Sequence, residues 1–323
     1  MGFWNRSSKS LDFEEQTLPW IDRTKSGTEL KRRVSAGQIS AQEAELLERW
    51  NRDGFLFLPE VVTAELIDAL WRDYERAWVE RPICNILVEG AGVIPFADAR
   101  PRSELGHHHY RINDFHNLSE AGSLILMNPT ILRLVHLILD DVPVAMQSLT
   151  FEYGSEQRCH QDFPFVKSGV LSSLVGSWVA SEDVTPENGP LFYYRGSHRI
   201  PKFSFDGELA FDGRKPELID AYEAYLDAEC RERGLEKVVQ QMRKGDVVLW
   251  HAALVHGGTP VLDRARTRKS FVSHYSTRTA YARDQRNPAD PNPRSRELNG
   301  GIYYLWTREG HRENLYPLVE RSA

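Results

Sequence analysis

Apolar residues near the start of the chain recur with the spacing of helices. The first forty residues are polar and predict an irregular extension. Ser40 and Glu43 then have the spacing of a capping box in front of an apolar face, which predicts the start of a helix at residue 41. A short apolar strand is expected at 55–58, and Thr63 can cap a second helix behind it. We therefore expect a helix, a strand and a helix to open the folded domain.

From residue 142 onward the pattern becomes that of strands. Branched, aromatic and polar residues mix in strand-length runs with turn formers between them. These runs lie at 144–151, 169–181, 189–194 and 245–255. One segment with helical periodicity, 216–235, interrupts them and contains Gly234 at its end. Several short strands separated by turns predict a β-sandwich or barrel.

The end of the chain predicts a long loop followed by a packed element. Pro288, Pro291 and Pro293 stand among many charges, and the aromatic run 302–306 follows them. The predicted organisation is a polar N-terminal extension at 1–40, a β domain at 41–282 with a helical insert at 216–235, and a loop and packing segment at 283–323 that belongs to the same domain.

Composition and charge narrow the function classes. The chain has 323 residues, 41% of them hydrophobic, and a net charge of −6, which is typical of a soluble globular protein and argues against nucleic acid as a partner. Cys84, Cys159 and Cys230 are widely spaced, which favours reduced thiols over a disulfide framework. The N-terminus lacks the apolar stretch of a signal peptide, and we expect no membrane span. The expected location is the cytoplasm.

His160 and Asp162 are the first candidates for chemistry. Residues two apart in an extended strand point to the same face, so this imidazole and this carboxylate can share one site. Two histidines and one carboxylate cover one face of an octahedral ion and leave three positions open. Alone the pair is a weak signal, because a His-x-Asp triplet arises by chance about once in a chain with this many histidines.

A second motif, 245–260, supplies the missing ligand. It reads as a strand that ends in His256, and Arg268 follows twelve residues later. A guanidinium grips a carboxylate through two parallel hydrogen bonds, and Thr259 can add a hydroxyl donor. The competing interpretation of Arg268 is a solvated charge among its basic neighbours.

His251 and the histidines at 107–109 are further candidate ligands. His251 is a rival to His256, but the two differ by an odd number and would face opposite ways on one regular strand. The cluster 107–109 places adjacent side chains on opposite faces, so we expect an exposed or substrate-facing loop there.

With these residues in place the chain resembles the phytanoyl-CoA dioxygenase family of iron(II)- and 2-oxoglutarate-dependent oxygenases. The resemblance covers about 45–280 and follows this order: Asp53-Gly54-Phe55, His160-Gln161-Asp162, 187–191, Gly196-Ser197-His198, Gly245-Asp246, His256-Gly257 and Arg268-Lys269. It implies a mainly β fold with flanking helices, namely a double-stranded β-helix (jelly roll, cupin-like).

The resemblance also implies roles for particular residues. His160, Asp162 and His256 match the family's iron ligands, and Arg268 its 2-oxoglutarate arginine. Trp178 and Thr259 match residues beside the cosubstrate, and Gln147 is a weaker candidate for the same place. The chain departs from the family at Gly258, where a serine is usual, and the spacing from histidine to arginine is about one residue longer than is common.

The expected function follows from this resemblance. Fe(II), 2-oxoglutarate and O2 would hydroxylate an unactivated C–H bond of a small organic substrate and release succinate and CO2. The carboxylate of Asp162 favours hydroxylation over halogenation, because halogenating relatives leave that position open. The alternatives are a jelly-roll protein that binds a small molecule without turnover and a zinc hydrolase. The substrate stays open among CoA thioesters, natural products, amino acids and lipid-derived molecules.

Overall fold

The computed structural model describes residues 11–82, 85–88, 92–105, 110–281 and 294–305. Its helices are α1 (Ser26–Ser35), α2 (Ala41–Asp53), α3 (Ala64–Glu80), α4 (Glu120–Leu126), α5 (Pro129–Leu139) and α6 (Leu218–Glu232). Its strands are β1 (Phe55–Leu58), β2 (Asn85–Val88), β3 (Gly92–Pro95), β4 (Tyr110–Asn113), β5 (Pro143–Phe151), β6 (Val175–Ala180), β7 (Leu191–Tyr194), β8 (Lys237–Val239), β9 (Val247–His251), β10 (His256–Gly258), β11 (Ser270–Thr277), β12 (Ser295–Leu298) and β13 (Gly301–Tyr304).

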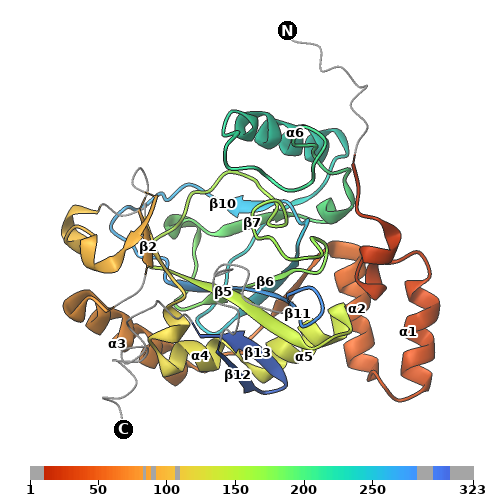
Figure 1. Ribbon diagram of the computed structural model, residues 1–323, viewed down its shortest axis with the longest axis horizontal. Helices are drawn as coiled ribbons and strands as arrows, with labels where there is room; N and C mark the ends of the chain where they lie inside the picture. The colour runs from red at the N-terminus through yellow and green to blue at the C-terminus, as the bar shows by residue number, and fades with distance from the viewer. Residues whose placement is uncertain (1–10, 83–84, 89–91, 106–109, 282–293, 306–323) are drawn as a thin grey trace.

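These strands form two sheets that face each other. The large sheet has the order β1-β9-β6-β11-β5-β4-β2-β3, with β13 joined to β5 and β12 to β13; the small sheet has the order β10-β7-β8. All pairings are antiparallel except that of β13 with β5. Figure 1 shows the small sheet between α6 and the large sheet, while α3, α4 and α5 lie beneath the large sheet. This is the predicted double-stranded β-helix with flanking helices.

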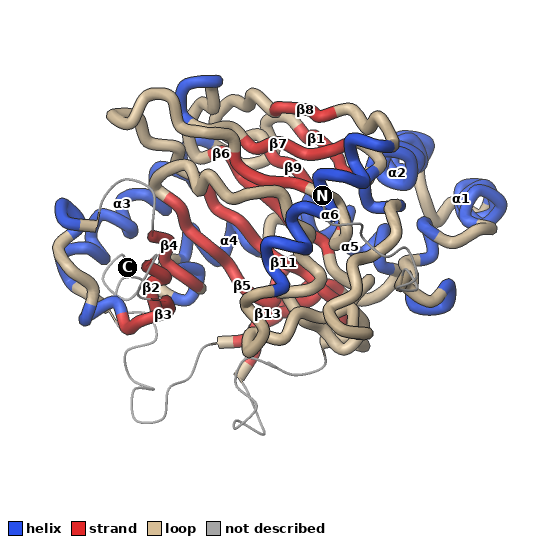
Figure 2. The backbone as a smooth tube through the Cα atoms, turned by 90° about the horizontal axis from the view of Figure 1, so that it is seen from above, coloured by secondary structure: helices blue, strands red, loops and turns tan. Residues whose placement is uncertain are grey.

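The large sheet is buried on both faces, and the strand alternation assigns each face its residues. Figure 2 shows α3 and α2 at opposite ends of the sheet, and its central strands β6, β9 and β11 are buried along their whole length. Val175, Leu249 and Phe271 belong to the core shared with the helices, whereas Trp178 and Trp250 belong to the core between the two sheets. Because successive side chains in a strand point to opposite faces, β6, β9 and β11 each contribute alternate residues to the interior between the sheets. That interior holds the site described below.

The expected strands and the helical insert are largely found. β1, β7 and β9 lie within the segments predicted from their alternation, β5 begins one residue before its segment, and α6 lies within 216–235. The run 169–181 forms a strand only from Val175. The region 83–105 is rich in Gly and Pro but contains β2 and β3, because their pairing with each other and with β4 compensates for the turn formers around them. Pro288 and its proline neighbours lie outside the described residues.

The expectation of an irregular segment at 1–40 is wrong for its described part. Residues 11–40 contain the helix α1 and a short 3-10 turn at Trp20–Asp22. Trp20 and Leu30 are buried in the core beneath the large sheet, and the indole of Trp20 donates a hydrogen bond to the carbonyl of Leu137 (2.7 Å). The hydrophobic pattern did not predict this helix, because α1 buries a single leucine and its other residues are largely polar.

The membrane expectation also needs a correction. Residues 120–139, which hold α4 and α5, are long and apolar enough by length and composition to cross a membrane. However, 67% of the stretch is buried inside the fold, as in the core helices of soluble proteins.

The capping box before α2 gives a first testable prediction. The hydroxyl of Ser40 accepts a hydrogen bond from the backbone N–H of Glu43 (3.2 Å), and the Glu43 carboxylate accepts one from the N–H of Ser40 (2.8 Å). Ser40→Ala should lower the free energy of unfolding by about 1 kcal/mol, because it leaves a helix N–H without its partner. Urea denaturation measures the change. Ser35→Ala, at the exposed end of α1, serves as the control and should change stability less.

Candidate metal centre

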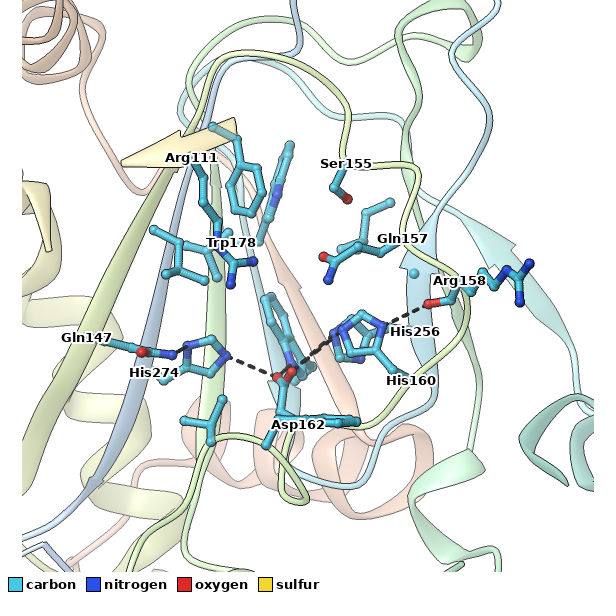
Figure 3. A pocket seen from close by; sticks show the side chains of 18 of the residues that line it. Arg111, Gln147, Ser155, Gln157, Arg158, His160, Asp162, Trp178, His256 and His274 are labelled. Carbon is cyan, nitrogen blue, oxygen red and sulfur yellow. Dashed lines mark hydrogen bonds and ion pairs between the residues drawn. The ribbon is translucent and has the colours of Figure 1, made fainter. Parts of the chain in front are cut away.

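Three side chains from distant parts of the chain meet between the two sheets. His160 Nε2 lies 3.8 Å and His256 Nε2 lies 3.6 Å from Asp162 Oδ1. The three ligand atoms lie within 4.8 Å of one another. Two ligands bound about 2.1 Å from one ion are separated by at most about 4.2 Å. Both distances fall below this limit, and Figure 3 shows the two imidazoles side by side and turned toward the carboxylate.

The backbone explains why these residues converge. His160 and His256 exchange two backbone hydrogen bonds of 2.9 Å, and the N–H of Asp162 donates to the carbonyl of Ala252 (3.0 Å). The intervening Gln161 is fully buried on the other side, where its amide donates to the carbonyl of Ala253 (2.7 Å). The sequence suggested a regular strand here, but the segment forms one isolated bridge followed by a turn. The alternation of its side chains survives.

Each histidine is held in the tautomer that a metal requires. His160 Nδ1 donates to the carbonyl of Arg158 and His256 Nδ1 to that of Leu254, both at 2.9 Å. A proton on Nδ1 leaves the lone pair of Nε2 free for an ion. Burial, followed by the proximity of His256, lowers the pKa of His160 to about 4, so this imidazole is neutral near pH 7.

The two oxygens of Asp162 have different tasks. Oδ2 accepts hydrogen bonds from Trp250 Nε1 (2.6 Å) and His274 Nε2 (3.2 Å), whereas Oδ1 faces the histidines. Burial alone would raise the pKa of Asp162, but His256, His274 and His160 outweigh it and hold the pKa well below the ordinary value. The carboxylate is therefore ionised and offers one free oxygen.

Trp250 depends in turn on a glycine in the neighbouring strand. A Cβ on Gly176 would lie 2.2 Å from the indole ring of Trp250, far inside contact distance. The absence of a side chain at Gly176 lets the indole lie flat across β6 and reach Asp162. His274, from β11, receives its own hydrogen bond at Nδ1 from the amide of Gln147 on β5 (3.1 Å).

Replacement of Trp250 should weaken metal binding without removing a ligand. Trp250→Phe deletes one of two donors to Asp162 Oδ2, and such outer partners commonly contribute about 10–100-fold to metal affinity. We expect the dissociation constant for Fe(II), measured anaerobically, to rise by about tenfold. Trp71→Phe, a buried tryptophan of α3 in the helical core, is the matched control. An unchanged affinity in Trp250→Phe would contradict this assignment.

His251 lies on the other face of the large sheet. Its Nε2 is 3.5 Å from Asp22 Oδ2, and its ring packs near Trp50 and His198. It cannot join the cluster of His160, Asp162 and His256. The parity argument from the sequence applies only in part, because His251 ends β9 and His256 begins β10 after an intervening turn. The residues 107–109 lie outside the described part of the chain.

A cavity of about 420 Å³ opens onto these ligands. Its lining comes from β4, β5, β6, β9 and β11 of the large sheet, from the ligand segment 155–166, from Leu191 and Gly257 of the small sheet, and from Ile219 and Glu223 of α6. Most of its wall is apolar. The volume suits a small organic ligand.

Arg268 stands in this cavity as a buried and incompletely paired cation. It is 2% exposed, its Nη1 donates to the carbonyl of Gly189 (3.1 Å), and its Nε has no hydrogen-bond partner among the described residues. The guanidinium lies 5.3 Å from the ring centre of Trp178. Burial lowers the pKa of Arg268 to about 10, which leaves it charged at pH 7. It is no solvated surface charge, which was the competing interpretation.

The remaining predicted residues divide between the cavity and its outside. Trp178 and Gln147 line the cavity. Thr259 is absent from its lining, and its hydroxyl donates to the carbonyl of Pro190 (3.1 Å); its contact with the cosubstrate stays a prediction. His274 and Arg111 also line the cavity, although no sequence motif singled them out. The alternation of β11 would have placed His274 inside had that strand been predicted.

These residues fit the group that the donor set implies. Two imidazole nitrogens and one carboxylate oxygen on one side of an ion suit ferrous iron with three open positions. The buried guanidinium with an unpartnered Nε fits the distal carboxylate of a 2-oxo diacid such as 2-oxoglutarate. Zinc accepts the same three donors, so the ligands alone do not choose the metal.

Comparison with protein families finds one match. The family model for phytanoyl-CoA dioxygenase (PhyH) covers residues 50–269, which is more than half of the chain. Among curated proteins, phytanoyl-CoA dioxygenase domain-containing protein 1 of Rattus norvegicus is 29% identical over 46% of this chain and 50% of its own length. The Bos taurus protein of the same name is 30% identical over 47% and 51%. The chain thus spans about half the length of the curated relatives that it matches.

Solved structures share the fold. The non-haem alpha-ketoglutarate-dependent epimerase SnoN from nogalamycin biosynthesis matches with a TM-score of 0.56 and 21% identity, over 83% of this chain and 99% of that chain. EctD from S. alaskensis, solved with 2-oxoglutarate and 5-hydroxyectoine, matches with a TM-score of 0.54 and 19% identity, over 75% and 77%. At these identities the likeness establishes the double-stranded β-helix.

Proposed function

The chain belongs to the phytanoyl-CoA dioxygenase family, and from this premise we propose that it is an iron(II)- and 2-oxoglutarate-dependent oxygenase acting on a small organic substrate. The observation that carries the proposal is the convergence of His160, Asp162 and His256 in one cavity with the buried guanidinium of Arg268. A site for a metal alone would not need that cation. A site for a 2-oxo diacid needs both.

His160, Asp162 and His256 would hold the iron, and Arg268 beside Trp178 would hold the distal carboxylate of 2-oxoglutarate. The chemistry supplied by the bound iron and cosubstrate is the activation of dioxygen, with decarboxylation of 2-oxoglutarate to succinate and CO2. The hydrogen bonds of Arg158 and Leu254 keep both Nε2 atoms turned inward.

The other residues of the cavity would control geometry and water. Trp250 and His274 occupy Asp162 Oδ2, so that the carboxylate offers a single oxygen and leaves room around the ion. Leu149, Val272 and Leu191 line the cavity with apolar surface, which limits the water that reaches a reactive centre. The substrate would undergo hydroxylation at an unactivated C–H bond, and the protein would work in the cytoplasm.

Turnover assays test this proposal against its two alternatives. The protein with Fe(II), 2-oxoglutarate and air is incubated with a panel of small metabolites, and succinate and products are measured by mass spectrometry. The proposal predicts succinate formation that requires iron and rises with one class of compound, together with a product heavier by one oxygen atom. A binding protein would retain a ligand without forming succinate, and a zinc hydrolase would act equally well without oxygen; either result would refute the proposal.

A further inference from the structure

A second cation in the cavity is left over once the cosubstrate is placed. Arg111, on β4, lies beside Phe151 of β5 in the strand register, and its guanidinium is 5.5 Å from that ring centre. Its side chain points into the cavity toward the candidate ligands (Figure 3). Its Nε is buried and has no hydrogen-bond partner among the described residues. The residue as a whole is only half-buried, but a buried N–H without a partner calls for an acceptor.

The charges of the site show which acceptor is missing. With the cosubstrate bound as proposed above, the two charges of a ferrous ion and that of Arg268 are balanced by Asp162 and by the two carboxylates of 2-oxoglutarate. The positive charge of Arg111 remains. At the mouth of the cavity Arg158 and Glu223 form their own ion pair (2.8 Å), so Glu223 already has a partner.

Part of the cavity wall is apolar and comes from the end of the ligand segment and from the helical insert. Phe165, 40% exposed, and Ile219 of α6 both line the cavity. Phe165 packs against Tyr222, which also belongs to α6, with ring centres 5.9 Å apart. Tyr222 also accepts a hydrogen bond from the backbone of Gln161 (2.7 Å). The insert is thus fixed to the ligand segment, and one of its faces forms part of the substrate wall.

We propose that the primary substrate is a small organic monocarboxylate whose acid group binds Arg111 and whose apolar body packs on Phe165 and Ile219. This inference rests on the proposed function, since it assigns the cosubstrate to Arg268 and the metal. It makes α6 a determinant of specificity.

Matched acids and amides test the anion contact. The probes are straight-chain and phenyl-substituted monocarboxylates of increasing length, each paired with its carboxamide. Binding to the anaerobic protein loaded with Fe(II) and 2-oxoglutarate is followed through the visible charge-transfer absorption of the complex. A charge-assisted hydrogen bond of this kind should make at least one acid bind about tenfold more tightly than its amide. If no acid is preferred over its amide, the proposal is overturned.

Variants separate the two halves of the proposal from the cosubstrate site. Arg111→Gln should abolish the preference for acid over amide while the dissociation constant of 2-oxoglutarate changes less than about twofold, and Arg111→Lys should keep part of the preference. Arg214→Gln, an exposed arginine, is the control. Ile219→Ala should weaken acid and amide alike. Equal weakening of 2-oxoglutarate binding in Arg111→Gln would assign the cation to the cosubstrate and overturn the proposal.

The failure of this inference can be told from failure of the proposed function. If iron and 2-oxoglutarate give no charge-transfer absorption in the unmodified protein, the oxygenase assignment itself fails. If the absorption forms and acids bind no better than amides, only the substrate class is wrong.

Discussion

Replacing His256 with alanine is expected to abolish succinate formation and to weaken Fe(II) binding by more than about 100-fold, beyond what outer partners contribute. The substitution removes one of three donors, and the remaining His160 and Asp162 cannot cover a face of the ion. Anaerobic titration with Fe(II), followed by a turnover assay, measures both effects.

The matched control is His251→Gln. His251 is buried like His256 and lies five residues earlier in the chain, but its side chain is on the opposite face of the large sheet beside Asp22. The variant should keep its affinity for Fe(II), although its stability falls because the buried N–H of Ala253 loses the Nδ1 atom that accepts its hydrogen bond (2.9 Å). If His251→Gln lost the metal and His256→Ala kept it, the ligand set proposed for this chain would be wrong.

Replacing Arg268 with glutamine should raise the dissociation constant of 2-oxoglutarate by about 30-fold or more, because truncating one partner of a buried charge pair costs about 2–5 kcal/mol. The affinity for Fe(II) should stay the same, since the guanidinium is placed against the cosubstrate and not the ion. Isothermal titration with the metal-loaded, anaerobic protein separates the two affinities.

Two further variants sharpen that result. Arg268→Lys keeps the charge but loses the planar fork, so its affinity for 2-oxoglutarate should lie between those of the unmodified protein and Arg268→Gln. Arg266→Gln, whose side chain is 53% exposed, should bind 2-oxoglutarate normally. Unchanged cosubstrate affinity in Arg268→Gln would mean that the unpaired cation serves another ligand.

The parts of this fold that could be predicted from the sequence are those governed by local periodicity. The capping box of Ser40 and Glu43 gave the start of α2 correctly, and strand alternation located β5, β7 and β9. The helix α1 was not predicted, because it packs beside Trp20, and Trp20 is itself held by a hydrogen bond to the distant α5. No local pattern reveals this contact. The same holds for β2 and β3, which exist through their pairing.

Only the site residues that belong to motifs with a recognisable spacing in the sequence could be predicted. His160, Asp162, His256 and Arg268 stood out by type and separation, and the structure places them around one cavity. The neighbours that orient Asp162 did not stand out, because Trp250 and His274 come from two strands whose register decides the contact. Gln147 stood out as a candidate beside the cosubstrate but not as the partner of His274. The role of Thr259 stays a prediction, since its hydroxyl donates to the carbonyl of Pro190 and no local pattern fixes how the backbone turns after β10.

The measurement that tests the central claim most directly is an anaerobic titration of the unmodified protein with Fe(II) and then with 2-oxoglutarate, followed by visible absorption. A 2-oxo acid chelated to ferrous iron gives a charge-transfer band that neither component gives alone. The account predicts that the band saturates at one iron per chain and is lost in His256→Ala. A band of equal strength in that variant, or no band in the unmodified protein, would contradict the claim that these two imidazoles and this carboxylate hold a cosubstrate-binding iron.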